Sequence, residues 1–146
     1  MDEGAATSAF QRAIASQKPQ FEEFFLARFL GLTFEYVGER CIVAFELKDF
    51  MFNPQGSLHG GLIATVLDIS MGHLLNHLQG PGSTLEMKTQ YVKAARQGRI
   101  QCCGEFIRRG RNISFLKSTM TDEDGATVAF ATATWMQLKT PAENMK

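Results

Sequence analysis

One segment of the chain combines a glycine-rich loop, a histidine and a single acidic residue at spacings that favour acyl-group hydrolysis. The loop runs from Asn53 through His59 to Gly60 and Gly61, and Asp68 follows seven residues later. A carboxylate can act as a general base, and free N–H groups in the first turn of a helix can stabilise an oxyanion. These residue types predict a hydrolytic site that works without a metal.

The segment after the loop, residues 60–78, predicts a long apolar helix in which Asp68 is the only charged side chain. Surface helices carry charges on one face, so we expect this helix to be buried on both faces. A buried carboxylate is costly unless it is paired or used, which favours a functional Asp68. Helical periodicity places Asp68 among small residues, on the side away from a broad apolar stripe that should meet a sheet. The stripe comprises Leu62, Ile63, Val66, Leu67, Ser70 and Leu74, and the small-residue face comprises Gly61, Ala64, Thr65, Asp68 and Gly72.

The composition bounds the class of protein. A chain of 146 residues suits one domain over 1–146, with an N-terminal helical segment over 1–31 and a core over 32–138. A hydrophobic content of 45% excludes disorder, and a formal net charge of zero disfavours nucleic acid or an anionic membrane as a partner. No apolar run is long enough to cross a membrane. An odd cysteine count without a secretory leader predicts free thiols in the cytoplasm.

The order of the remaining elements predicts an α+β fold. A weak helix is expected over 7–17, after six frayed residues. A second is expected from Pro19 through Phe29 or Leu30, with Gly31 as its stop. Six segments of period two should form a curved antiparallel sheet wrapped around the central helix. The last five or so residues are expected to be disordered. The strands are expected at residues 32–37, 40–47, 83–92, 99–109, 112–121 and 126–138.

A motif in the loop and the central helix resembles the hotdog-fold acyl-CoA thioesterases of the PaaI-like group. The motif is Asn53-x-x-Gly56-x-x-His59-Gly60-Gly61, followed by Asp68. The resemblance covers residues 32–138 and includes the strand start at Ser83 and Thr84. It implies a hotdog fold that hydrolyses an acyl-CoA to a free acid and coenzyme A. It also implies no cofactor and a homo-oligomer, either a dimer or a homotetramer formed as a dimer of dimers.

The resemblance assigns roles to the acid and to the helix start. Asp68 would act as a general base or as a nucleophile on the thioester carbon, and the Gly60 N–H would polarise the thioester carbonyl. Gly61 would contribute to substrate binding beside it. Thr84, or Ser83 next to it, would hold the attacking water. In relatives, the acid and the hydroxyl residue come from one subunit and the glycine loop comes from the other.

Two loop residues have both a functional and a structural interpretation. By resemblance, Asn53 would position the water or the carbonyl across the subunit interface, and His59 would orient the loop. Asn53 before Pro54 is also an ordinary turn residue, and His59 could serve only as support for the loop. The sequence leaves both interpretations open.

Three arginines surround a predicted hairpin tip. Arg108, Arg109 and Arg111 could form a solvated turn, or they could bind the phosphates of coenzyme A, since guanidinium groups pair well with phosphate. Lys93 and Arg96 are expected in a neighbouring loop. The resemblance places nucleotide binding near this region.

Other features bear on the substrate and on alternative activities. The phenylalanines of the second predicted helix, with Met51 and Phe52, predict an apolar or aromatic acyl pocket. His73 and His77 have the spacing of a metal pair, but no third ligand accompanies them, so no metal is expected. Two alternatives to hydrolysis remain: a hydratase or dehydratase acting on acyl thioesters, and a non-catalytic acyl-CoA-binding protein.

Overall fold

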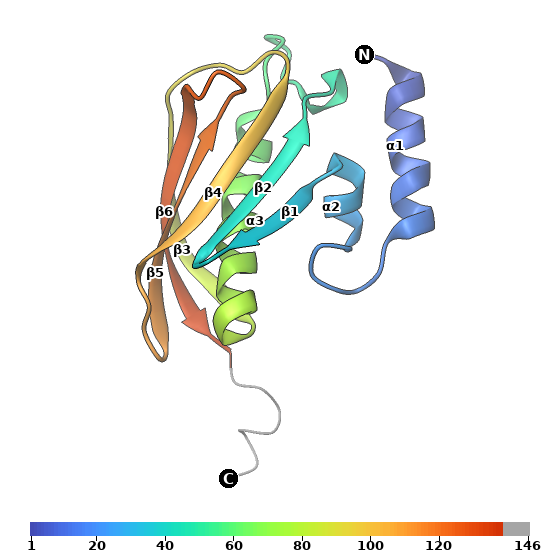
Figure 1. Ribbon diagram of the computed structural model, residues 1–146. Coiled ribbons are helices and arrows are strands. Elements are labelled where there is room, and N and C mark those ends of the chain that lie inside the picture. The colour runs from blue at the N-terminus through green and yellow to red at the C-terminus, as the bar shows by residue number, and fades with distance from the viewer. Residues whose placement is uncertain (139–146) are drawn as a thin grey trace.

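A six-stranded antiparallel sheet curves around one long helix, and two further helices stand beside one edge of the sheet (Figure 1). The structure is a computed structural model that describes residues 1–138. Its elements are α1 (Glu3–Ser16), α2 (Phe25–Leu30), β1 (Thr33–Val37), β2 (Arg40–Glu46), a 3-10 helix η1 (Asp49–Met51), α3 (Gly60–Gln79), β3 (Gly82–Tyr91), β4 (Arg99–Arg108), β5 (Ile113–Thr121) and β6 (Thr127–Gln137). The strand order β1-β2-β4-β5-β6-β3 leaves β1 and β3 at the edges. The expected α+β architecture is confirmed, and all six strands lie where the alternation predicts them to within two residues.

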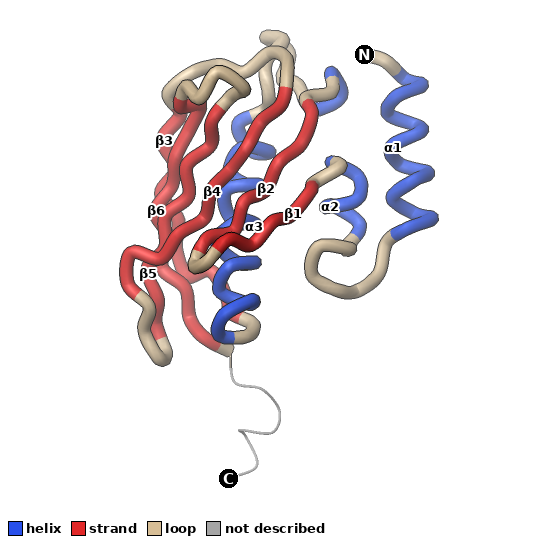
Figure 2. Tube along the Cα trace, viewed as in Figure 1, coloured by secondary structure: helices blue, strands red, loops and turns tan. Residues whose placement is uncertain are grey.

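The helix α3 lies in the concave face of the sheet, as the tube in Figure 2 shows. It approaches β4 closely because Gly104 has no side chain: a Cβ there would lie 2.5 Å from the carbonyl oxygen of Ser70. The hydroxyl of Ser70 is buried and donates to the Leu67 carbonyl oxygen at 2.8 Å. It also lies 2.6 Å from the hydroxyl of Ser118 on β5. The polar groups at this helix–sheet contact therefore satisfy one another.

The predicted division of α3 into two faces was wrong on one side. Gly72 was expected to face away from the sheet, but a Cβ on it would lie 2.6 Å from the ring of Trp135 on β6. Asp68 likewise bonds to Thr84 of β3 instead of pointing away from the sheet. The curved sheet wraps further around the helix than a flat layer would. Leu62 and the small residues near the start of α3 are partly or fully exposed, so within a single chain only the sheet-facing side of this end of the helix is buried.

The N-terminal segment departs most from expectation. The first residues do not fray: α1 begins at Glu3, because the carboxylate of Asp2 accepts the Ala5 N–H at 2.9 Å and caps the helix. The second helix begins at Phe25 and not at Pro19. The intervening turn contains Glu22 at a φ of 68°, a left-handed conformation that ends regular helix. The expected disorder of the last residues concerns a part of the chain outside the described residues.

Candidate active site

The carboxylate of Asp68 is held by a hydroxyl from the edge of the sheet. Thr84 Oγ1 donates to Asp68 Oδ1 at 2.9 Å, joining the third turn of α3 to the start of β3. The register of β3 against β6 shifts between Thr84 and Glu86, so Leu85 is an extra residue at this point. Such a bulge changes the direction of the strand and its side chains. Ser83, the alternative to Thr84, has no hydrogen bond from its side chain within residues 1–138.

Burial and hydrogen bonding act on Asp68 in opposite directions. Burial is the larger effect and raises the pKa of Asp68 above its usual value of 3.8. The hydrogen bond from Thr84 stabilises the carboxylate and lowers that pKa in part. A carboxylate that binds a proton more tightly than usual is a stronger base.

The first turn of α3 offers one backbone donor to a ligand. His59 is the N-cap, and its Nδ1 accepts the Gly61 N–H at 2.9 Å. The Gly60 N–H has no hydrogen-bond partner among the described residues, as expected for the first residue of a helix. Tyr91, at the end of β3, donates its hydroxyl to the Gly60 carbonyl oxygen at 3.1 Å. No role was predicted for Tyr91 from the sequence, where its only signal was its place in the alternation of the strand after the helix.

Gly60 and Asp68 do not meet within one chain. Eight residues of α-helix separate them, which places their backbones about 12 Å apart along the axis. A thioester carbonyl that accepts the Gly60 N–H therefore cannot also contact the Asp68 carboxylate of the same chain.

Asn53 stabilises its own turn within the chain. Its Oδ1 accepts the N–H groups of Gln55 at 3.0 Å and Ser57 at 3.2 Å. Its Nδ2 donates to the hydroxyl of Ser57 at 3.2 Å. These contacts match the structural interpretation of Asn53.

The three arginines of the β4–β5 turn differ in their contacts. Arg109 is engaged: its guanidinium donates to Glu39 at 3.0 Å and to the Leu78 carbonyl oxygen, near the end of α3, at 2.7 Å. Arg108 and Arg111 are exposed and have no ion-pair partner among residues 1–138.

The loop that contains Lys93 and Arg96 is not a neighbour of these arginines. It precedes β4, whereas the arginine turn follows β4, and a ten-residue strand separates its two ends by about 30 Å. Lys93 pairs with Asp122 at 2.6 Å. The expectation of one basic cluster was wrong, because the two basic turns lie at opposite ends of β4.

His73 is a structural residue. It is buried and stacks on the ring of Phe34 at 4.6 Å. Its Nε2 accepts the Glu22 N–H at 3.2 Å, and its ring also bonds to the backbone of Ile69. His77 instead stacks on Tyr36 at 4.0 Å. Within residues 1–138, no group of three metal-ligating side chains gathers here or elsewhere.

Comparison with known proteins places the chain in a family. The sequence pattern of the thioesterase superfamily matches residues 55–129, which include Gly60, Asp68 and Thr84. The medium/long-chain acyl-CoA thioesterase YigI of Salmonella typhimurium is 28% identical over 129 residues, covering 75% of this chain and 83% of YigI. Within residues 1–138, no helix has the combined length and apolar character needed to cross a bilayer.

Solved structures share the fold. A phenylacetic acid degradation-related protein from Ralstonia eutropha is 26% identical, with a TM-score of 0.72 over 88% of this chain and 99% of that one. The PaaI protein of Escherichia coli, from the phenylacetic acid degradation operon, has a TM-score of 0.78 at 16% identity over 92% and 96% of the two chains. The long helix and the curved sheet agree with these structures, and the match over residues 55–129 shows that the chain belongs to the thioesterase superfamily, the thioester hydrolases of the hotdog fold.

Proposed function

We propose that the chain hydrolyses an acyl-CoA to a free acid and coenzyme A at a site shared by two copies of the chain. The observation that carries the proposal is the half-buried Asp68 carboxylate, held by Thr84 at the exposed edge of the sheet. YigI, which is similar to this chain, acts on medium- and long-chain acyl-CoA by its name, and this supports the same class of substrate.

In the proposed reaction, Asp68 acts as a general base. It takes a proton from a water that Thr84 helps to hold, and the hydroxide oxygen adds to the thioester carbon. The carbonyl oxygen becomes an oxyanion and accepts the Gly60 N–H of the second copy. The C–S bond then breaks, coenzyme A leaves as a thiolate, and the thiolate takes the proton from Asp68. Direct nucleophilic attack by Asp68 is the alternative first step.

The two halves of this site lie at opposite ends of β3. Thr84 and Asp68 are near its start, and Tyr91 holds Gly60 at its end. A twofold pairing of the β3 edges runs the two strands antiparallel, so the start of one strand lies beside the end of the other. This pairing brings Asp68 of one copy toward Gly60 of the second copy. Within one chain the two residues cannot meet, because about two helical turns, or about 12 Å, separate them along α3.

The loop residues and arginines have secondary roles in this proposal. Asn53 shapes the loop and presents it to the neighbouring copy, and His59 leaves the Gly60 N–H free by accepting that of Gly61. Arg108 and Arg111 are the better candidates for the phosphates of coenzyme A, since Arg109 already contacts Glu39.

The three free thiols favour a cytoplasmic location. A dimer of dimers remains a further proposal.

Replacement of the base tests the proposal. Asp68→Asn keeps the size of the side chain but removes its basicity, so we expect turnover of octanoyl-CoA and phenylacetyl-CoA to fall by about 10²- to 10⁴-fold. Release of free thiol measures the rate, and thermal unfolding verifies the fold. Near-normal turnover in Asp68→Asn would reject the mechanism.

The same assay separates the alternatives. A hydratase or dehydratase would change the absorbance of an enoyl thioester without releasing thiol. A binding protein would retain coenzyme A ligands and release no thiol from aryl, short-chain or long-chain substrates. Either outcome for the wild-type protein would replace the hydrolase assignment of this site.

A further inference from the structure

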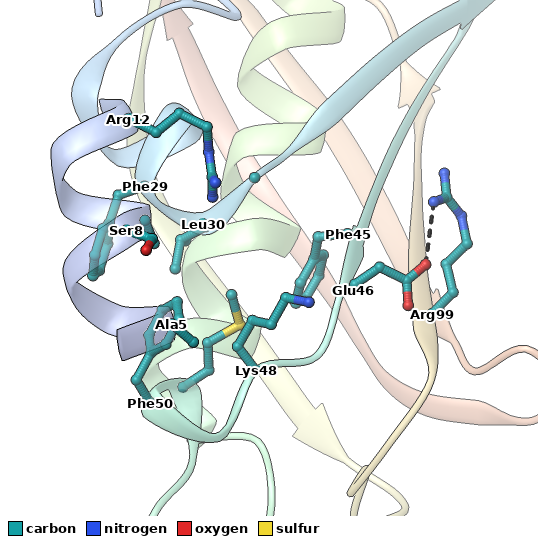
Figure 3. Close-up of a pocket in the computed structure, with 13 residues that line it drawn as sticks. Ala5, Ser8, Arg12, Phe29, Leu30, Phe45, Glu46, Lys48, Phe50 and Arg99 are labelled. Atoms are coloured by element: carbon teal, nitrogen blue, oxygen red, sulfur yellow. Dashed lines mark hydrogen bonds and ion pairs between the residues drawn. The ribbon is translucent and has the colours of Figure 1, made fainter. Parts of the chain in front are cut away.

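A cavity of about 380 Å³ lies between α1, α2 and the end of β2 (Figure 3). It exists because β1 is shorter than β2: the register pairs Thr33 with Ala44, so Phe45 and Glu46 extend beyond β1. The two N-terminal helices stand over this extension. The volume falls in the range of small-molecule sites, which is roughly 300–1,000 Å³.

The walls of the cavity are largely apolar, and contacts with η1 hold both N-terminal helices in place. They include Phe29 and Met51, from the cluster that the sequence suggested as an acyl pocket, and also Phe50, which was not part of that prediction. The rings of Phe29 and Phe50 lie 5.3 Å apart and join α2 to η1. The carboxylate of Asp49 accepts the Asp2 N–H at 2.6 Å and ties the start of α1 to η1. The cavity is therefore preformed.

The polar lining of the cavity is cationic. Arg12 on α1 and Lys48 after β2 both border it, and neither side chain has a hydrogen-bond or ion-pair partner among residues 1–138. Figure 3 shows both side chains at the border of the cavity, together with Leu30. Glu46, the acidic residue of the lining, pairs with Arg99 at 3.4 Å. The cavity thus presents two uncompensated positive charges beside apolar walls.

We propose that this cavity binds a carboxylic acid with an apolar tail. The carboxylate would lie between Arg12 and Lys48, and the tail would pack on the apolar walls. The acyl group of a thioester carries no charge, so two cations beside apolar walls suit the carboxylate of a free acid better than the acyl group of an acyl-CoA. Moreover, neither Asp68 nor Gly60 lines the cavity. The acid that hydrolysis releases is a carboxylic acid with an apolar tail, so it could bind here. This connection between the cavity and the reaction rests on the proposed function.

Titration with sodium octanoate in a calorimeter tests the site, with octan-1-ol as the uncharged counterpart. Arg12→Gln/Lys48→Gln removes both charges at exposed positions, and we expect it to weaken octanoate binding at least tenfold. Octan-1-ol should bind the wild type and this variant equally. Arg40→Gln/Lys117→Gln removes the same net charge elsewhere on the surface and should leave octanoate binding unchanged.

A second variant fills the cavity without changing its charge. Ser8 borders the cavity from an exposed position on α1, and Ser8→Leu should reduce octanoate binding while thermal unfolding stays as in the wild type. Undetectable binding to the wild type, or equal affinity of the wild type and Arg12→Gln/Lys48→Gln, overturns the proposal. The titration requires no turnover. Loss of the thioesterase assignment would therefore leave the site standing, and loss of octanoate binding would leave the thioesterase assignment standing.

Discussion

At the residue scale, the chemistry of the candidate site depends on the pKa of the half-buried Asp68 carboxylate. Burial raises the pKa of Asp68, and the Thr84 hydroxyl moves it back in part. The two effects leave a base that is stronger than an exposed aspartate, with a carboxylate form that one hydrogen bond stabilises. Thr84 therefore helps to set the basicity of Asp68.

This balance makes the pH dependence of hydrolysis sensitive to Thr84. The active form is the carboxylate, so activity falls as pH decreases through the pKa of Asp68. Thr84→Val removes the bond that lowers this pKa, and the acidic limb of kcat/KM should move to higher pH. Thr84→Ser keeps a hydroxyl and should retain the wild-type limb. A profile of kcat/KM from about pH 4 to 9 measures the shift, and coincident limbs for all three proteins would contradict the assigned role.

Gly60 allows the backbone donor to be removed with little change in fold. It is the first residue of α3, where proline is well tolerated, and His59 before it is already extended at φ −62° and ψ 130°. Gly60→Pro should lower kcat by about 10²- to 10³-fold because it removes the N–H. Gly60→Ala keeps the N–H, and its Cβ would meet Tyr91 at an ordinary 3.4 Å. Equal rates for the two variants would exclude the Gly60 N–H from catalysis.

At the element scale, α3 is fixed in place by groups that do no chemistry. His73 joins α3 to the turn before α2 through the Glu22 N–H, and its ring contacts Phe21 and Phe34. Burial lowers the pKa of His73 below 6.5, although Glu22 and the bond to Ile69 oppose the shift. The turn therefore depends on a neutral imidazole that accepts a hydrogen bond.

The lowered pKa of His73 makes stability depend on pH. Below pH 6.5 the unfolded chain binds a proton at this position that the folded chain resists, so the free energy of unfolding should fall as pH decreases toward the folded pKa. His73→Gln should cost about 1–3 kcal/mol near neutral pH and reduce this slope. Urea unfolding at several pH values measures both effects. His77→Gln, at an exposed position, is the control, and an unchanged slope in His73→Gln would refute the assignment.

At the scale of the whole molecule, the proposed mechanism divides the site into two halves that lie far apart in a single chain. β3 is an edge strand with Leu85 53% exposed, and unpaired strand edges tend to pair with another chain. Because Asp68 and Gly60 lie toward opposite ends of this strand, one twofold contact would complete two sites at once. In the proposed mechanism, activity therefore requires this pairing of two copies.

Complementation between two inactive variants tests this link. A mixed dimer of Asp68→Asn and Gly60→Pro contains one intact site, with Asp68 from one chain and Gly60 from the other. Random mixing by refolding or co-expression should restore roughly a quarter of wild-type activity, since half of the dimers are mixed and each has one intact site of two. Failure to exceed the activity of the separate variants would show that the site is not shared.

Much of the fold could be predicted because its signals are local. Alternation of apolar residues predicted all six strands, and the apolar run after His59 predicted α3. The N-terminal segment was harder because α1 begins through the cap of Asp2, and the turn at Glu22 depends on His73, which is 51 residues away along the chain. Helical angles alone also misplaced Gly72, because the curvature of the sheet is a property of the packed strands.

The sequence by itself determined the family motif, the lone acidic residue of the helix and the free N–H at the helix start, since each depends on neighbours within a few residues. Only the tertiary structure decided that Thr84, and not Ser83, reaches Asp68, that Arg109 is already engaged, and that Gly60 lies too far from Asp68 in one chain. The reason is physical: periodicity encodes which side of an element is apolar, whereas strand register, a bulge and sheet curvature determine which distant side chains meet.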